Sequence, residues 1–476
     1  MNRFLCQLKN PLSLFYLATA FTIFVNVELI LHDFFWLAWM IPVLLLVTIF
    51  LVFSIDNVLF FIVFATPLAI NMEDVLPKLS ISFPTDPLLA VLLLVFIVKL
   101  LMGQVPDRRV FSHPVVIAVM INLTWMLFTS FTSQFPTVSF KYLTARLWYV
   151  VPMLFMGTAL FSDLRKIHRF YWLYIISFCI VIINTTINHA GYAFSEKGAN
   201  WAMSPFFNDH TAYAVMLAFF IPILAGFSLS KIYSPKLRII SCLVLFLFIL
   251  ALILSYCRAA WFSLIVSMIV MVPIVLKIKM RWLLLGLVTL VGFYYVYQQQ
   301  IVDRLEKNKQ DSSANYIEHF QSMLNVSSDA SNLERINRWN SALRLFKEHP
   351  NLGWGPGTYQ FVYAPYQLSQ DRTIISTNQG NKGTAHSEYL GPLSESGWPG
   401  LLSVLFLFSV IIFTGIRVYQ RAINPEVRIL SLVTLLGLIS YFSHGIMNNF
   451  LDTDKASVPF WGFAAIIVAL DLYHKE

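Results

Sequence analysis

The chain has 476 residues, of which 58% are hydrophobic and only 12% are charged, and its mean hydropathy is +0.68. Soluble domains carry about 25% charged residues, so this composition excludes a soluble globular protein and indicates one that crosses a membrane several times. Its four cysteines are scattered, without Cys-x-x-Cys or metal-ligand spacing, so neither disulfide bonds nor zinc are expected.

Apolar segments of about 20 residues can cross a bilayer as helices. Those in this chain predict an all-α, polytopic membrane protein with about 12–14 transmembrane helices. The first segment resembles an uncleaved anchor, because no small-x-small cleavage site follows it. The fourteen candidates are residues 12–31, 34–54, 56–72, 86–102, 114–133, 140–161, 168–188, 211–229, 238–256, 259–276, 281–298, 399–419, 427–447 and 456–473.

Lysine and arginine residues are distributed unevenly between the two sides of these helices. With the N-terminus placed in the cytoplasm, 17 lie on the cytoplasmic side and 6 lie in the short outer connections. This bias agrees with the positive-inside rule and places residues 299–398 outside. That segment has 9 basic and 10 acidic residues, so the net charge of +8 is mainly topological and does not support nucleic-acid binding.

A polar segment of about a hundred residues interrupts the apolar ones and divides the chain into three regions. We expect transmembrane helices in residues 1–298 and 399–476 and one large, partly helical outer loop in residues 299–398. Residues 299–330 are the most polar, and we expect them to be a flexible lead-in. A membrane protein that keeps one large loop outside the bilayer commonly uses it for chemistry or recognition.

The loop itself has a readable pattern. Ser331 and Glu334 form a capping box, and apolar residues then recur every three or four positions from Leu333 to Phe346. This spacing predicts an amphipathic helix, which should end near His349 because Pro350 disfavours helix at the residue before it.

Several chemically suggestive residues belong to this loop or flank it. Arg335 and Arg338 lie three residues apart and so share one flank of the predicted helix. The glycine-rich turn at 353–357 allows positive φ and close backbone approach, and His386 precedes the return to the membrane. Arg258 lies between two apolar segments with almost no loop, where an ionisable group is expensive and suggests function.

These motifs, in this order, resemble the superfamily of O-antigen ligases and polysaccharide polymerases. Residues 255–261, Ser-Tyr-Cys-Arg-Ala-Ala-Trp, are similar to its Ser-x-x-Arg-small-small motif. The matching loop motifs are Arg338-Trp339, Pro350, the turn at 353–357, His386-Ser387-Glu388-Tyr389-Leu390 and Glu395-Ser396-Gly397-Trp398-Pro399-Gly400. The resemblance covers about residues 255–400, and fourteen segments exceed the twelve usual for the ligases. It implies a fold like that of GT-C glycosyltransferases.

The resemblance also implies an activity: inverting, metal-independent transfer of a glycan from undecaprenyl diphosphate to a sugar hydroxyl, without a cofactor. The acceptor would be lipid A–core for a ligase or a second lipid-linked glycan for a polymerase. Arg258 and Arg338, with Arg335 as a weaker candidate, would bind the diphosphate, because guanidinium groups bind phosphate oxygens bidentately. His386 would be the base, since imidazole titrates near neutral pH.

Simpler roles remain open for each of these residues. Arginines at helix ends often extend to lipid headgroups, Arg338 and Arg335 could be solvated, His386 could be a capping residue, and the glycine turn could be purely structural. Gly355 and Gly357 could otherwise supply backbone donors or line the substrate path. The remaining candidates for that path are Lys141, Arg146, Asn208 and His210, near the outer ends of segments.

Other functions also remain open. A transporter or flippase of lipid-linked sugars is the main alternative, although it would not need this loop. A non-catalytic scaffold and a protein O-oligosaccharyltransferase are weaker ones. The expected location is the bacterial inner membrane, with both termini cytoplasmic and the loop periplasmic. Expected partners are the lipid-linked donor, the glycan acceptor, membrane lipids and other proteins of polysaccharide assembly, in the biosynthesis of lipopolysaccharide or exopolysaccharide.

Overall fold

The computed structural model describes residues 55–72, 81–104, 107–278, 330–373, 376 and 383–474. The chain forms two compact units, Met1–Phe61 and Ile62–Glu476, and the second contains every described helix and strand except the first turns of a helix that begins at Ile55. In the described ranges the protein is an all-α polytopic membrane protein: nine helices there are long and apolar enough to cross a bilayer, and the only sheet is a two-stranded antiparallel ribbon.

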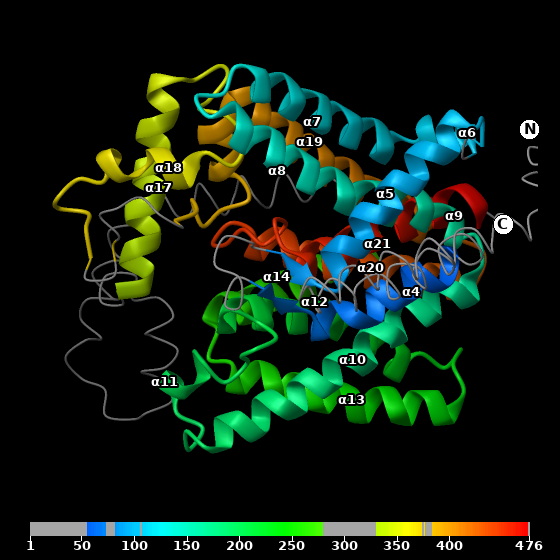
Figure 1. Cartoon of the computed structure of the whole chain (residues 1–476). Coiled ribbons are helices and arrows are strands. Elements are labelled where there is room, and N and C mark those ends of the chain that lie inside the picture. Colours follow the sequence, from blue (N-terminus) through cyan, green and yellow to red (C-terminus); the bar gives the residue numbers. More distant parts are fainter. Residues whose placement is uncertain are drawn as a thin grey trace, which may run out of the picture. The chain divides into compact units, whose positions relative to one another are not determined.

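The helices and strands follow one another along the chain as Figure 1 labels them. Before the outer loop they are α4 (Ile55–Ala65), η1 (Thr66–Leu68), β1 (Ile70–Asn71), β2 (Ser82–Phe83), α5 (Thr85–Leu101), α6 (Arg108–Phe111), α7 (Pro114–Phe131), α8 (Pro136–Val150), η3 (Val151–Met156), α9 (Gly157–Leu160), α10 (Leu164–Ala190), α11 (Glu196–Ala199), α12 (His210–Leu229), α13 (Pro235–Leu254) and α14 (Arg258–Val275). The loop and the C-terminal part contain α17 (Ala330–Glu348), α18 (Tyr359–Val362), η4 (Ala364–Tyr366), α19 (Leu390–Arg421), α20 (Pro425–His444) and α21 (Asp454–Tyr473).

Several long helices begin at a capping residue followed by proline. Proline fits the first helical position because its missing N–H would have no partner there. Ser234 and Asn424 cap α13 and α20 by accepting backbone N–H groups, and His113 does the same for α7 through its ring. Local sequence signals therefore fix where these spans begin.

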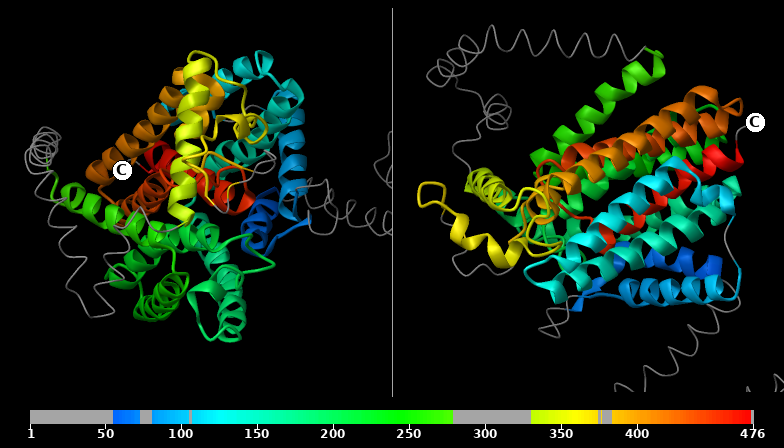
Figure 2. Two further views of the ribbon diagram at one scale, coloured as in Figure 1. Left: turned by 90° about the vertical axis from the view of Figure 1, so that its left-hand side faces the viewer. Right: turned by 90° about the horizontal axis from the view of Figure 1, so that it is seen from above.

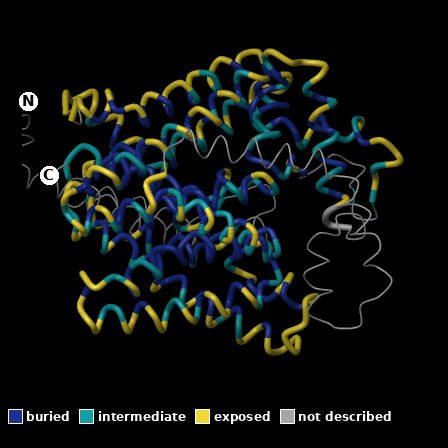
Figure 3. Tube along the Cα trace, turned by 180° about the vertical axis from the view of Figure 1, so that it is seen from behind, coloured by how far each residue is buried: buried dark blue, intermediate teal, exposed yellow. Residues whose placement is uncertain are grey.

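Three helices form the centre of the bundle. In α12, α20 and α21, 78%, 78% and 83% of the most apolar stretch is buried, against 22% in α13 and 28% in α14. Figure 3 shows the buried residues concentrated along these central helices. Phe219, Tyr441 and Phe463, one from each, pack their rings together. In a bilayer the exposed apolar faces of α13 and α14 would meet lipid.

Eleven of the fourteen predicted segments fall on described residues, and each contains a helix. The segments 12–31, 34–54 and 281–298 lie outside them. Segment 56–72 is shorter than predicted, because the α-helix stops at Ala65 and a 3-10 turn containing Pro67 follows. Segment 399–419 is longer: α19 begins at Leu390 and kinks at Gly397, where φ is 70°.

The outer loop lies at one end of the bundle, and the C-terminal end of α21 lies at the other (Figures 1 and 2). The predicted loop helix is confirmed as α17, which ends at Glu348, directly before His349. The division into 1–298, 299–398 and 399–476 and the orientation in the membrane stay predictions, and residues 299–329 of the lead-in lie outside the described ranges.

Two details predicted for α17 are wrong. The helix begins at Ala330, so Ser331 lies within it rather than capping it. Its buried face carries Glu334, Asn337, Arg338, Ser341, Ala342 and Leu345, whereas Leu333 and Leu343 of the predicted apolar stripe are exposed. Polar groups can occupy this face because they form hydrogen bonds with the rest of the loop: the side-chain amide of Asn337 donates to the side-chain oxygen of Gln367 at 2.8 Å.

Candidate functional site

The buried face of α17 holds Arg338 firmly in place. Its Nε donates to Glu334 at 2.8 Å, and its Nη1 donates to the backbone oxygen of Thr384 at 3.2 Å. Its guanidinium carbon lies 5.3 Å from the ring centre of Tyr363. The pKa of Glu334 is lowered, because hydrogen bonds from Ser376 and Arg338 and the charge of Arg338 outweigh burial. Arg338 therefore joins α17 to the segment that carries His386.

His386 lies in the extended segment 383–388 that leads into α19. Its backbone is left-handed, with φ of 47°, which is uncommon for a residue other than glycine. The indole N–H of Trp339 donates to its carbonyl oxygen at 3.4 Å, and its own N–H donates to the Thr384 hydroxyl at 3.4 Å. Such backbone outliers cluster at functional sites, so this geometry supports a role for the side chain.

The environment of His386 is basic. Burial, and after it the charges of Arg338 and Arg335, lower the pKa of His386 to about 4, against an ordinary value of 6.5. The prediction of an imidazole that titrates near neutral pH is therefore wrong for the protein alone. The ring is neutral at pH 7 and able to accept a proton, but it is a weak base until the positive charge around it is compensated.

Arg258 lies at the start of α14, after a turn in which Tyr256 has φ of 52°. Its side chain is 30% exposed, and its Nη2 lies 3.8 Å from a carboxylate oxygen of Glu196 on α11. A helix N-terminus carries partial positive charge, which favours anions. The position thus combines a fixed cation and a helix dipole at the loop end of the bundle.

Electrostatic interactions connect Arg258 to the loop. Burial raises the pKa of its neighbour, the Cys257 thiol, to about 11, and the charges of Arg335 and Asp209 both reach that thiol. The charges of Arg335 and Asp209 also act on His386 and on His210, the first residue of α12. The structure therefore brings Arg258, Arg335 and Arg338, the arginine cluster, to one end of the bundle together with His386 and His210.

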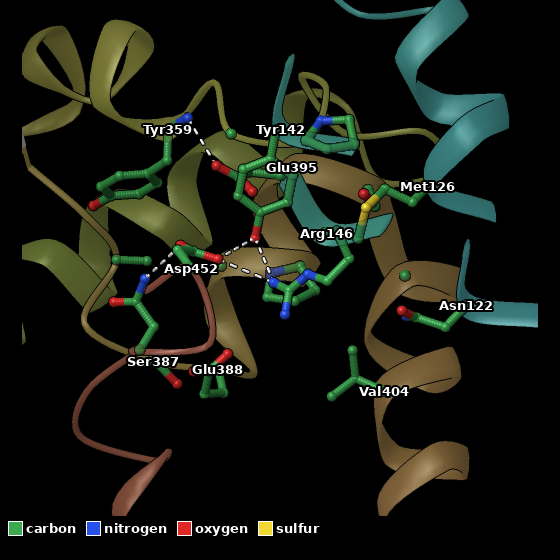
Figure 4. A pocket seen from close by; sticks show the side chains of 18 of the residues that line it. Asn122, Met126, Tyr142, Arg146, Tyr359, Ser387, Glu388, Glu395, Val404 and Asp452 are labelled. Carbon is green, nitrogen blue, oxygen red and sulfur yellow. Dashed lines mark hydrogen bonds and ion pairs between the residues drawn. The ribbon is translucent and has the colours of Figure 1, made fainter. Parts of the chain in front are cut away.

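A cavity of about 260 Å³ adjoins segment 383–388 and is lined by Gly383, Thr384, Ala385, Ser387 and Glu388 of that segment. Figure 4 shows the ion pair at its wall: Arg146 Nη2 lies 3.0 Å from Asp452, and the Tyr142 hydroxyl donates to the same carboxylate at 2.8 Å.

Glu388, which is buried, and Glu395, which is half-buried, are acids in the wall of this cavity. Glu388 accepts hydrogen bonds from the backbone of Phe450 and Leu451 and from the hydroxyl of Tyr441. Burial, and after it the charge of Asp452, raise its pKa. Glu395 accepts from the backbone N–H of Tyr359 at 3.0 Å. Of the predicted path residues, Arg146 and Gly357 line this cavity.

The backbone of the glycine turn is hydrogen-bonded to neighbouring segments of the protein. The N–H groups of Gly353, Trp354 and Gly355 donate to backbone oxygens of His349, Ser394 and Glu395, so these three are not available to a phosphate. A side chain at Gly355, where φ is +110°, would stand 1.9 Å from the hydroxyl of Ser133. The turn therefore fastens the loop to α19 and to the α7–α8 connection.

Two further predicted path residues, Lys141 on α8 and Asn208 before α12, are exposed and do not line the cavity. Sequence reasoning assigned no role to Tyr142, Asp452 or Trp461, which do line it. Asp452 and its ionic partner Arg146 are 306 positions apart in the chain. No spacing along the chain could have indicated that pair.

Comparison with known families agrees with the predicted resemblance. Residues 243–405 match the family model described as O-antigen ligase, so the match includes Arg258, α17, His386 and the start of α19. It spans roughly a third of the chain and supports the predicted superfamily. A search of curated proteins found no match.

Proposed function

We propose that this chain, which matches the O-antigen ligase family over residues 243–405, is a membrane glycosyltransferase of the ligase or polymerase type. It transfers a glycan from undecaprenyl diphosphate to a sugar hydroxyl. One observation carries the proposal: a half-buried histidine, His386, lies within reach of the charges of two arginines, Arg338 and Arg335, at the loop end of the bundle. That arrangement suits an anionic leaving group beside a base.

The arginines take different parts in this proposal. Arg258 and Arg335, which are both partly exposed, bind the diphosphate oxygens. Arg338 is buried against Glu334 and Tyr363, so it supplies positive charge and positions the His386 segment. The sequence ranked Arg338 above Arg335, and the exposure of the two side chains favours the reverse order for direct contact.

The reaction is a single displacement. The acceptor hydroxyl oxygen attacks the anomeric carbon of the donor and forms the new glycosidic bond. The bond between that carbon and the diphosphate oxygen breaks, and the diphosphate leaves with the electron pair. The hydroxyl proton passes to the imidazole of His386. One attack from the face opposite the leaving group inverts the anomeric configuration, and the arginines compensate the diphosphate charge without a metal ion.

Donor binding would also activate the base. The charges of Arg338 and Arg335 help to keep the pKa of His386 near 4. A bound diphosphate brings negative charge to the same arginines and therefore raises that pKa. His386 becomes a competent base only when the leaving group is present, which suppresses proton transfer in the absence of donor.

An apolar groove provides a place for the polyprenyl tail. It has a volume of about 430 Å³ and is lined by α12, α13 and α14, with Trp261 and Ile265 on α14. Trp261 lies three residues after Arg258, so the groove begins one helical turn from the proposed diphosphate site. This arrangement supports entry of the donor from the outer leaflet of the inner membrane.

The test is transfer in reconstituted vesicles. Lipid-diphosphate glycan is supplied with either lipid A–core or a second lipid-linked repeat unit, and wild type is compared with His386→Gln. Product on lipid A–core identifies a ligase, and a ladder of longer lipid-linked chains identifies a polymerase. We expect the variant to lose about 10²–10⁴-fold in rate, the usual contribution of a general base.

The matched control is His349→Gln, a histidine in the same loop that is exposed at the end of α17. It should transfer like wild type. If neither acceptor is glycosylated by wild type, or if His386→Gln transfers normally, the enzyme assignment fails. Transport of the lipid-linked sugar across the vesicle membrane would then be measured in its place.

A further inference from the structure

We propose that the cavity beside His386 binds a neutral sugar ring of a lipid-linked acceptor, whose hydrocarbon lies in the apolar groove between α7 and α19. This inference rests on the proposed function and adds to it the acceptor site and the acceptor's chemical class. Segment 383–388 carries His386 and contributes residues on both sides of it to the cavity wall. His386 does not itself line the cavity, but both of its neighbours in the chain, Ala385 and Ser387, do, so a sugar held there lies against the segment that carries the proposed base.

The charge of the cavity favours a neutral ligand. Its lining has three carboxyl groups, Glu388, Glu395 and Asp452, and a single cation, Arg146, which is already paired with Asp452 at 3.0 Å. A phosphate or a sugar acid would meet these carboxyl groups and, among the lining residues, no unpaired arginine or lysine, so its burial there would be costly. The anionic donor therefore belongs with the arginine cluster and not here.

Polar groups without partners also point to a ligand. Trp461 is 3% exposed and lines the cavity, and its indole N–H has no hydrogen-bond partner among the described residues. Across that same part of the protein, the side-chain oxygen of Asn449 is likewise buried without a partner and belongs to a lining residue. Buried polar groups are nearly always hydrogen-bonded, and a sugar hydroxyl is both donor and acceptor, so it can satisfy either.

The size and walls of the cavity suit a single ring. Its volume of about 260 Å³ is slightly below the range of roughly 300–1,000 Å³ for sites that hold drug-sized ligands. Trp125, Tyr142 and Trp461 supply aromatic surface, and Arg146 and Asp452 supply charged hydrogen-bonding groups. Apolar faces and hydroxyl edges of a sugar match this combination.

An apolar groove adjoins the cavity. It has a volume of about 760 Å³ and shares the wall residues Trp125 and Ser403 with the cavity. Ile121 and Phe128, which also line it, are 47% and 50% exposed, so the groove faces the surroundings of the bundle. Because the groove is apolar and adjoins the cavity, its proposed occupant is the hydrocarbon of the molecule whose sugar fills the cavity. The proposed donor groove lies between other helices, α12, α13 and α14.

Sugar binding is tested first, without catalysis. Saturation-transfer NMR is recorded on the full chain in nanodiscs, with methyl β-glucoside, methyl β-N-acetylglucosaminide or methyl β-glucuronide as the probe. Trp461→Phe removes only the unpartnered N–H and keeps the ring, so the fold should survive. Trp148→Phe is the matched control at an indole that does not line the cavity.

We expect saturable signals from at least one neutral glycoside and none from the glucuronide. Trp461→Phe should weaken the neutral signal about tenfold, as expected for the loss of one hydrogen bond in a buried site, whereas Trp148→Phe should leave it unchanged. Equal binding of the glucuronide, no binding of either neutral probe, or full binding by Trp461→Phe would overturn the proposal.

The KM values for the two substrates then show which of them binds in the cavity. Trp461→Phe and the groove variant Thr124→Trp should raise the KM for the lipid-linked acceptor about tenfold and leave the KM for the donor unchanged. Ile183→Trp, at a position 52% exposed on α10 and outside this groove, is the control for a bulky lipid-facing residue. A raised donor KM would assign the cavity to the donor's own sugar and overturn the acceptor assignment.

Failure of this inference is distinguishable from failure of the proposed function. If wild type transfers glycan and His386→Gln does not, while the cavity and groove variants behave like wild type, only the acceptor site is wrong. If wild type transfers nothing, the proposed function fails, and the NMR binding measurement still reports on the cavity.

Discussion

Segment 383–388 contacts two regions of opposite character at the loop end of the bundle. The first is the arginine cluster, which lies with His386 and His210. The second is the cavity, which has three carboxyl groups and one arginine, which is ion-paired. The first region favours a diphosphate and the second a neutral polyhydroxyl ring.

The difference follows from the chemistry proposed for the site. A glycosyl transfer needs an anionic leaving group on one face of the reacting carbon and a neutral nucleophile on the opposite face. Two regions of like charge would bind either substrate in either place. Opposite charge gives each substrate a single location, beside the segment that carries His386, and so it provides specificity as well as affinity.

Within the arginine cluster, the largest effect should come from removing the cation at the start of α14. Arg258→Gln should lower kcat/KM for the lipid-diphosphate donor about 100-fold, because hydrogen bonds to charged groups contribute roughly 1.5–3 kcal/mol each. The kcat/KM of Arg258→Lys should lie between those of wild type and Arg258→Gln, since an ammonium group keeps the charge but not the bidentate geometry. The measurement is initial rate against donor concentration at fixed acceptor.

Arg372→Gln supplies the control for this prediction, because Arg372 is an exposed arginine of the same loop. The acceptor KM should stay constant in all three variants. An effect of Arg258→Gln on the acceptor alone would contradict the division of the site into two regions.

A second large effect is expected on stability, at the turn that fastens the loop to α19. Gly353 has φ of +66°, and a Cβ there would stand 2.2 Å from the carbonyl carbon of Glu395. Gly353→Ala should therefore lower the free energy of unfolding by about 2 kcal/mol or more. Gly391→Ala is the matched control, because nothing lies within 4 Å of its added methyl group. Thermal unfolding in detergent, followed by circular dichroism, compares them.

Much of the fold could be predicted from the sequence. Length and hydropathy predicted the membrane helices, although α13 begins at Pro235, after the cap Ser234, and not at the predicted residue 238. The family motifs linked Arg258, Arg338 and His386 through their order along the chain, and their roles stay predictions. Hydropathy is a local signal, and the order of the motifs can be seen in the chain itself.

The acidic cavity could not be predicted in the same way. It joins Arg146 on α8 to Asp452, 306 positions later, and to Glu395 on α19. Only tertiary packing brings these groups together. The buried face of α17 was missed for a related reason: periodicity counts apolar residues, whereas Asn337 and Arg338 are buried because distant groups hydrogen-bond them.

A smaller effect should appear in the pH dependence of the arginine side. Arg335 helps to lower the pKa of His386, so Arg335→Gln should raise that pKa from its value of about 4. The acid limb of kcat/KM, which reports the free enzyme, should move to higher pH. Lys347→Gln, an exposed position on the same helix, should not move it. If the acid limb of Arg335→Gln stayed at the wild-type pH, the charge of Arg335 would not act on His386.

The lowered pKa of His386 also makes the stability of the folded protein depend on pH. The pKa of His386 is lower in the folded protein than its ordinary 6.5, so protonation favours unfolding. The contribution of His386 to stability is present above about pH 6.5 and is lost as the pH falls toward 4. Arg335→Gln should narrow the pH range over which this contribution to stability is lost. Thermal unfolding between pH 4 and pH 7 would detect the change.

The smallest effect is expected on the cavity side, at Glu388. Burial and the charge of Asp452 raise the pKa of this carboxyl group, so folding favours its neutral form. Its oxygen accepts the N–H groups of Phe450 and Leu451 at 2.8 and 3.0 Å. Glutamine keeps that acceptor without the charge, so Glu388→Gln should change the free energy of unfolding by less than about 1 kcal/mol, whereas Glu388→Ala should cost roughly 2–3 kcal/mol.

The acceptor KM of Glu388→Gln then tests whether the cavity, unlike the arginine cluster, binds its substrate without using charge. A neutral sugar needs hydrogen-bonding oxygens but no net negative charge, so the KM should stay within a few-fold of wild type. A large rise in KM would mean that the cavity uses the carboxylate charge itself, as it would for an amino sugar. Because the arginine cluster needs its charge and the cavity needs only its acceptors, charge-neutral replacements should damage the first region and spare the second.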